Sequence, residues 1–129
     1  MNPGTGFLRP VSSTTLTNPA TAIRAITVGA YDSLTFSYAD FSGRGPLTGE
    51  SASAVKPDLV APGVNVSTIS VGGGVAEFSG TSFATPFVTG SAALLMEWGI
   101  VRGNDIYLYG EKVKAYLRRG AKPMPGFEE

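Results

Sequence analysis

The pattern of hydrophobic positions along the chain predicts several strands. Residues 23–30 (Ile-Arg-Ala-Ile-Thr-Val-Gly-Ala) are β-branched and almost continuously apolar. Such a run is typical of a strand buried on both faces of a parallel sheet. Residues 64–71 and 75–78 predict two further strands, and the glycines 72–74 between them predict a hairpin turn.

The second half of the chain changes to a helical pattern. Residues 82–98 predict a long helix that is apolar nearly all round, which indicates a buried helix. We expect Gly99 to end it. Residues 109–119 predict a second helix, which Gly120 ends. The side chains of this second helix expected to face inward are Val113, Tyr116 and Leu117.

The remaining segments complete a chain of the α/β class. Residues 34–41 carry three aromatic side chains that are expected to form a patch over the core, namely Phe36, Tyr38 and Phe41. Residues 1–22 are rich in Pro, Gly, Ser, Thr and Asn, which is typical of a loop or an exposed strand. At 129 residues, the chain is one domain or a piece of one.

Composition excludes several classes of partner and chemistry. The formal net charge is zero and 43% of residues are hydrophobic, so we expect neither a nucleic-acid nor a membrane partner. No apolar run approaches the length of a membrane span. Cysteine and histidine are absent and the carboxylates are scattered, so no metal site or cofactor is expected. Basic residues cluster late in the chain, and a solvated helix face explains them better than an anion site: Lys112, Lys114, Arg118, Arg119 and Lys122.

The residues that most clearly suggest catalytic chemistry are 80–86, Gly-Thr-Ser-Phe-Ala-Thr-Pro, at the start of the long helix. A serine at a loop-to-helix junction has its hydroxyl near unpaired first-turn N–H groups and the positive end of the helix dipole. Such N–H groups can hold the oxyanion of an acyl-transfer intermediate. Gly80 would let a substrate backbone come close to Ser82. The alternative is that Ser82 is an ordinary helix cap.

The absence of histidine bears directly on this serine. Serine hydrolases usually activate the hydroxyl with a neighbouring general base, most often histidine. Two explanations therefore stay open. Either Ser82 is not a nucleophile, or its base lies on another part of the protein.

Residues 80–86 resemble the nucleophile motif G-T-S-x-A-T/S-P of subtilisin-like serine proteases, the subtilases. Residues 56–63 (Lys-Pro-Asp-Leu-Val-Ala-Pro-Gly) are similar to a second subtilase segment, K-P-D-[LIV]-x-A-P-G, and residues 28–30 to the end of a subtilase strand. Other stretches resemble a narrower group, the clostridial germination (Csp-type) subtilases. These stretches are residues 14–17, 37–45 and 98–120.

The resemblance implies a role for each residue around the serine. Ser82 would be the nucleophile, and its own N–H would contribute to the oxyanion hole. Gly80 and the Thr81 hydroxyl would support it, and Ser79 and Phe83 would flank the leaving-group side. The family's Asp and His precede the serine along the chain, and so does its oxyanion-hole asparagine. Asp58 is not expected to be the triad acid, because it lies in a structural segment.

These considerations predict the C-terminal portion of a subtilase catalytic domain. Residues 1–22 would be the exit from a missing upstream region, a jelly-roll domain in the Csp-type group, and residues 122–129 a tail. Residues 23–121 would belong to the catalytic domain of a serine endopeptidase. The chain alone would be inactive, and its partners would be a protein or peptide substrate and either the missing N-terminal part or a second copy. A secreted or spore-associated location is expected.

Two alternatives remain from the sequence. The first is a subtilase pseudoprotease with a binding or regulatory role in germination, in which the upstream region has lost His or Asp. The second is a freestanding small binding domain that only mimics the motif. A helix that is apolar all round argues against the second, because a small domain would leave it partly uncovered.

Overall fold

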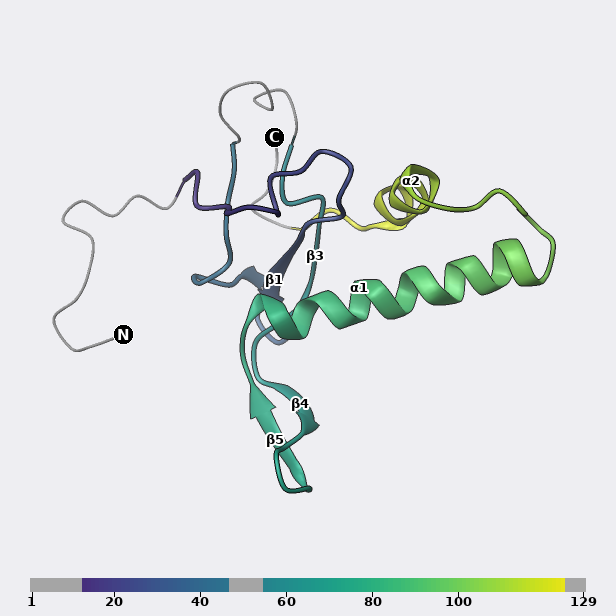
Figure 1. Cartoon of the computed structure of the whole chain (residues 1–129). Coiled ribbons are helices and arrows are strands. Elements are labelled where there is room, and N and C mark those ends of the chain that lie inside the picture. Colours follow the sequence, from purple (N-terminus) through teal and green to yellow (C-terminus); the bar gives the residue numbers. More distant parts are fainter. Residues whose placement is uncertain (1–12, 47–54, 125–129) are drawn as a thin grey trace, which may run out of the picture.

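The computed structural model describes residues 13–46 and 55–124, and its helices and strands form a small sheet, a projecting hairpin and two helices (Figure 1). The proposed exit segment 1–22 and tail 122–129 therefore lie partly outside the described residues. The elements in chain order are β1 (Val28–Asp32), β2 (Ser37–Tyr38), β3 (Leu59–Pro62), β4 (Val66–Ile69), β5 (Val75–Phe78), α1 (Thr81–Met96), the π-helical turn η2 (Glu97–Val101) and α2 (Glu111–Gly120).

The sheet has the order β2-β1-β3, and its central pair is parallel. Val28 lies opposite Leu59 in this pair, whereas β2 runs antiparallel to β1 and pairs with it only at Tyr31 and Asp32. Strands β4 and β5 form a separate antiparallel hairpin that projects away from the sheet (Figure 1). A parallel pair crossed by a helix confirms the predicted α/β class, and the hairpin confirms the predicted turn at residues 72–74.

The first strand begins later than the sequence predicts. Residues 23–25 form a turn and a bend, residues 26–27 are irregular, and β1 starts only at Val28 and continues to Asp32. The physical reason lies at Thr27, whose amide donates to the Asp58 carboxylate at 2.8 Å and whose hydroxyl donates to the Ala20 carbonyl at 2.6 Å. These bonds fix Thr27 outside the regular ladder.

The expected aromatic patch over the core is wrong. Phe36 is 61% exposed and Phe41 is 51% exposed, and Phe36 stacks on Tyr31 of β1. The Tyr38 hydroxyl donates to the Gly43 carbonyl at 2.7 Å. The core consists instead of small side chains: Ala30, Ala39, Ala61 and Ala84, with Val28, Val64 and Val88 packed against them.

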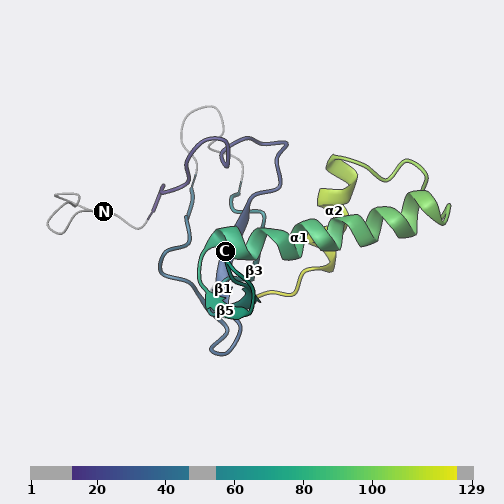
Figure 2. The same cartoon turned by 60° about the horizontal axis from the view of Figure 1, so that its bottom comes forward.

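Helix α1 confirms the predicted helix but not its burial. Its N-terminal part lies across β1 and β3, and the rest extends beyond the sheet (Figures 1 and 2). Ala84 is its one buried residue, while Phe87 is 47% exposed and Leu94 is 69% exposed. By length and composition, the helical residues Thr81–Val101 could cross a membrane. This finding contradicts the prediction that no apolar run approaches the length of a membrane span. Core helices of soluble proteins have the same length and composition.

The prediction that Gly99 ends the helix is also wrong. The chain continues past Met96 into η2, and Gly99 is buried inside that turn. A Cβ at Gly99 would lie 2.5 Å from Cδ2 of Leu108, the largest fully buried side chain among the described residues. Glycine is therefore required here for close packing, and not for ending the helix.

Helix α2 agrees with the predicted second helix in position. Val113 is buried and Leu117 is half-buried, as expected, but Tyr116 is 40% exposed. The prediction that the basic residues form a solvated helix face is wrong for Lys114, whose side chain is only 14% exposed. Its ammonium lies 2.7 Å from Oδ1 of Asp58 and also donates to the carbonyl of Ala25.

Asp58 is the centre of a buried ionic network that ties α2 to the sheet. Its Oδ2 accepts from Nζ of Lys56 at 2.6 Å and from the Thr27 amide, and its Oδ1 lies against Lys114. The side chains of Lys56 and Asp58 are 1% and 2% exposed. Burial raises the pKa of Asp58, but the hydrogen bonds from Lys114 and Lys56 outweigh it, so the pKa lies below its ordinary value. Burial also lowers the pKa of Lys56, and the hydrogen bond to Asp58 offsets only part of this lowering.

We expect Asp58→Asn to destabilise the fold strongly. The substitution leaves the Lys56 ammonium buried without its carboxylate, and breaking a buried pair in this way costs about 3–5 kcal/mol. Urea denaturation followed by circular dichroism measures the free energy of unfolding. The matched control is Asp105→Asn, which removes a carboxylate paired with the half-exposed Lys112 and should change stability far less. Equal effects of the two substitutions would contradict the structural role of Asp58.

Candidate active site

Ser82 lies in the first turn of α1, immediately after a glycine with unusual backbone geometry. Gly80 is the N-cap of the helix, with φ 155° and ψ 157°. Residues that carry a side chain rarely adopt this backbone conformation. The turn therefore requires the glycine that the motif supplies, and Thr81 and Ser82 become the first two residues of the helix.

The geometry excludes the interpretation of Ser82 as an ordinary helix cap. The N-cap is Gly80, and no side chain caps this end of the helix. Other hydroxyls on α1 donate to carbonyls four residues back, those of Thr85 and Thr89 at 2.9 and 3.1 Å. Ser82 is exposed, and its hydroxyl makes no hydrogen bond within the described part of the chain. The Ser82 hydroxyl therefore remains available for chemistry.

The backbone amides at this helix start are partly uncommitted. The amides of Phe83 and Ala84 donate to the Gly80 carbonyl at 3.0 and 3.4 Å. The amides of Thr81 and Ser82 belong to the first-turn N–H groups that have no partner within the helix. Both lie at the positive end of the helix dipole, which favours a nearby negative charge. This arrangement suits the Ser82 amide to stabilising an oxyanion.

The turn before Ser82 is held by bonds to the β3–β4 connection. The Gly80 amide donates to the Gly63 carbonyl at 2.8 Å. The Asn65 amide donates to Oγ of Ser79 at 2.9 Å. Phe83 stacks on Phe78 with ring centroids 5.3 Å apart. Ser79 and Phe83 therefore fix the turn locally, while their predicted place beside a leaving group stays a prediction.

Gly63 marks the closest approach of the sheet to the helix. A Cβ there would lie 2.6 Å from Cβ of Ala30, 3.0 Å from the Gly80 carbonyl oxygen and 3.3 Å from Cβ of Ala84. Sequence reasoning assigned residues 56–63 to a structural segment but missed this contact. The sequence signal for this contact was the small residues in both segments, but small residues alone do not show that the two segments meet.

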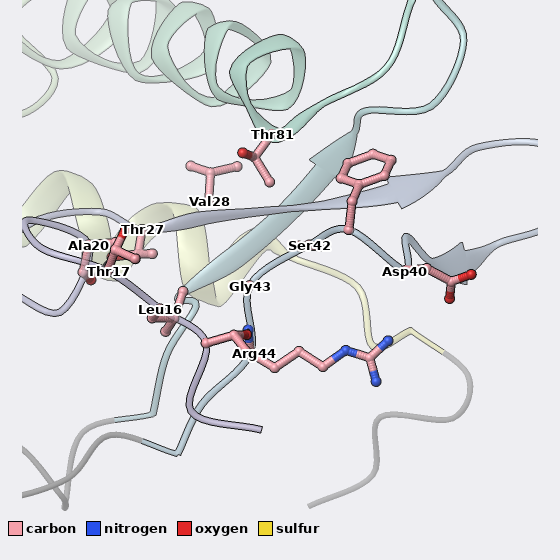
Figure 3. A pocket seen from close by; sticks show the side chains of 12 residues that line it. Leu16, Thr17, Ala20, Thr27, Val28, Asp40, Ser42, Gly43, Arg44 and Thr81 are labelled. Carbon is pink, nitrogen blue, oxygen red and sulfur yellow. Dashed lines mark hydrogen bonds between the residues drawn. The ribbon is translucent and has the colours of Figure 1, made fainter. Parts of the chain in front are cut away.

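An open cleft of about 390 Å³ lies beside the turn, and sequence reasoning missed it as well. The Thr81 side chain points from the start of α1 toward the cleft, above Val28 (Figure 3). The other lining residues come from the segments 15–20, 27–28 and 40–44. No single motif could have predicted it, because segments far apart in sequence form its walls.

We expect Gly63→Ala to destabilise the fold and displace the start of α1. The added methyl group would overlap Ala30 and crowd Gly80, and overpacking of this kind costs about 1–3 kcal/mol. Gly90→Ala is the matched control, because nothing lies within 4 Å of a Cβ there, and it should stabilise the helix by up to about 1 kcal/mol. Thermal melts of the two variants test this pair. A Gly63→Ala variant as stable as the parent would contradict the close approach.

Ser82 lies in the first turn of a helix that packs on the parallel pair β1 and β3, and serine hydrolases also place their nucleophile at a turn into a helix beside parallel strands. The sequence model described as "Subtilase family" matches residues 8–128, so the chain belongs to the subtilases. Among solved structures, it is similar to the CspB protease of Clostridium perfringens, with 46% identity and a TM-score of 0.86. That match covers 95% of this chain and 26% of the CspB chain.

Other relatives agree with this assignment. A cold-adapted subtilisin-like serine proteinase has 33% identity and a TM-score of 0.63, over 81% of this chain and 32% of its own. Pyrolysin of Pyrococcus furiosus is 36% identical over 84% of this chain and 9% of its own length. The subtilisin-like fold and the resemblance to Csp-type proteases are thus confirmed. The chain spans only a small part of the relatives that it matches.

Proposed function

We propose that this chain supplies the nucleophile of a serine endopeptidase. Ser82 would attack the carbonyl carbon of a peptide bond, transfer its proton to a general base, and form an acyl-enzyme that water then hydrolyses. The observation that carries the proposal is the exposed Ser82 hydroxyl, with no hydrogen bond among the described residues, in the first turn of α1. The Ser82 amide would hold the oxyanion, with the Thr81 hydroxyl beside it.

The chain contains only part of this machinery. It has no histidine, so the base that accepts the Ser82 proton must come from elsewhere. We propose that a further polypeptide segment, either linked to this chain or separate, carries the family's His, its Asp and its oxyanion-hole asparagine. An extracellular location is part of this proposal, and the relatives give no support for association with spores.

The isolated chain should not react at Ser82. Without a general base, the hydroxyl is a weak nucleophile at neutral pH. A fluorophosphonate probe, followed by intact-mass spectrometry, is expected to leave the chain unlabelled. The control is a subtilisin labelled under the same conditions. Rapid stoichiometric labelling of Ser82 would show that the chain activates it without a histidine.

Ser82→Ala should abolish proteolysis in the protein that also carries the His and Asp. Loss of the nucleophile is expected to lower kcat/KM by about 10⁴-fold or more. The thermal melt should change little, because Ser82 makes no capping bond. Thr85→Ala is the control, since that hydroxyl bonds only to the Thr81 carbonyl. Activity retained in purified Ser82→Ala protein would overturn the nucleophile assignment.

A pseudoprotease with a regulatory role in germination is the second candidate function. The absence of histidine from all 129 residues is compatible with it, because Ser82 has no histidine base unless another segment supplies one. The two candidates differ only in the residues supplied by the rest of the protein. The upstream coding sequence distinguishes them, since an active protease requires the His and the Asp.

A further inference from the structure

The connection between η2 and α2 exposes apolar side chains at the end of the molecule far from Ser82. Ile106, Tyr107 and Tyr109 are each more than half exposed, and Val101 of η2 is 78% exposed. The connection lies beyond the end of α1, away from the sheet (Figures 1 and 2). Because the 16 residues of α1 span about 24 Å, the length of this helix separates these side chains from the candidate active site. Apolar side chains that gather on a surface in this way mark an interaction site.

Contacts within the connection hold it in one shape. Leu108 is buried, and it packs so closely on Gly99 that a Cβ at Gly99 would lie 2.5 Å from its Cδ2. The Asp105 amide donates to the Gly99 carbonyl at 2.9 Å, and the Asp105 carboxylate pairs with Nζ of Lys112 on α2 at 2.6 Å. Leu108 is therefore anchored inside, while the residues on either side of it are exposed. A segment fixed in this way presents its exposed side chains at a lower entropy cost of binding.

The formal net charge of zero conceals an uneven distribution, because residues 98–124 carry six basic side chains and two acidic ones. The basic residues are Arg102, Lys112, Lys114, Arg118, Arg119 and Lys122. The acidic residues, Asp105 and Glu111, are both paired with cations. Arg118, Arg119 and Lys122 are exposed and have no ionic partner in the part of the chain that the structure describes. This end of the molecule therefore attracts anions, and the prediction of no membrane partner, which rested on the net charge, does not extend to it.

This combination of side chains favours a lipid surface over other partners. Aromatic rings such as those of Tyr and Trp98 gather at the headgroup level of membranes, and Lys and Arg bind anionic headgroups. A second copy of this chain would bring the same positive charge to the interface, which opposes pairing. Protein interfaces are also depleted in Lys. Nucleic acid would stack on the tyrosines, but it offers no comparable partner for the aliphatic side chains of Val101 and Ile106.

Val101, Ile106, Tyr107 and Tyr109, together with the three cations that have no ionic partner, form what we call the η2–α2 surface. We propose that this surface binds an anionic lipid bilayer. The apolar side chains would enter the headgroup region, the cations would lie against the lipid phosphates, and no part of the chain would span the bilayer. The inference goes beyond the proposed function, because a protease and a pseudoprotease could each be held at a membrane in this way.

Sedimentation of the whole chain with lipid vesicles tests the proposal. Vesicles of equal parts phosphatidylglycerol and phosphatidylcholine should bind it about tenfold or more tightly than vesicles of phosphatidylcholine alone, because the cations contribute only on the anionic surface. Added salt should weaken binding to the anionic vesicles. Trp98 is the one tryptophan of the chain and is 43% exposed. Its fluorescence emission should therefore shift to shorter wavelength when the η2–α2 surface enters the bilayer.

Matched substitutions locate the lipid contact. Tyr107→Ser removes an exposed ring from the η2–α2 surface and should weaken binding to anionic vesicles by about tenfold or more. Phe87→Ser removes an exposed ring from α1 and should leave binding unchanged. Arg118→Glu combined with Arg119→Glu changes only exposed side chains and should abolish the preference for anionic vesicles. Circular dichroism of each variant checks that the fold is retained.

The outcomes separate this inference from the proposed function. Tighter binding to anionic vesicles that Tyr107→Ser weakens supports the η2–α2 surface, whether or not fluorophosphonate labels Ser82 in the complete protein. Equal binding to both kinds of vesicle, or no binding, overturns the inference and leaves the proposed function untouched. A greater loss in Phe87→Ser identifies α1 as the lipid contact and also overturns it. So does tighter binding of a single-stranded oligonucleotide than of vesicles, which identifies nucleic acid as the partner.

Discussion

The close contact between the β3–β4 connection and the start of α1 is the constraint on which the candidate site depends. At Gly63 the sheet and helix meet with no space for a side chain, against Ala30 and Ala84. The Gly80 amide bonds to the Gly63 carbonyl at the same point. The start of α1 is thereby fixed beyond the carboxyl ends of β1 and β3. Open α/β sheets bind their ligands at that end of parallel strands, so the small residues of the core place the start of α1, with Ser82, at the end of the sheet where such folds bind ligands.

A second anchor of opposite character holds the other end of the sheet. The buried carboxylate of Asp58 joins the segment before β1, through Thr27, to Lys114 on α2. A buried ionic network contributes little net stability compared with a well-packed apolar one, but it is costly to break. The apolar contact fixes the start of α1, and the ionic contact fixes α2, which packs beside α1.

The parts of the fold that were predicted correctly depend on local sequence, and those that were missed depend on long-range contacts. The glycines 72–74 and Gly80 set their own turns, so the hairpin and the helix start follow from sequence. The late start of β1 depends on Asp58, which bonds to the Thr27 amide, and the role of Gly99 depends on Leu108. The motif predicted the position of Ser82 at the start of a helix for the same reason. The cleft beside it could not be foreseen, because distant segments form its walls.

On the proposed function, one further polypeptide segment would explain both the exposure of α1 and the absence of histidine from the chain. A helix this apolar could be covered by lipid or by protein, and its composition allows either. Lipid is disfavoured because Ala84 and Val88 already pack against the core, so part of the helix surface contacts protein. Phe87 and Leu94 remain exposed, and burying such side chains contributes about 1.5–3 kcal/mol each. A polypeptide that covered them and brought the histidine would therefore bind by apolar contact while completing the chemistry at Ser82.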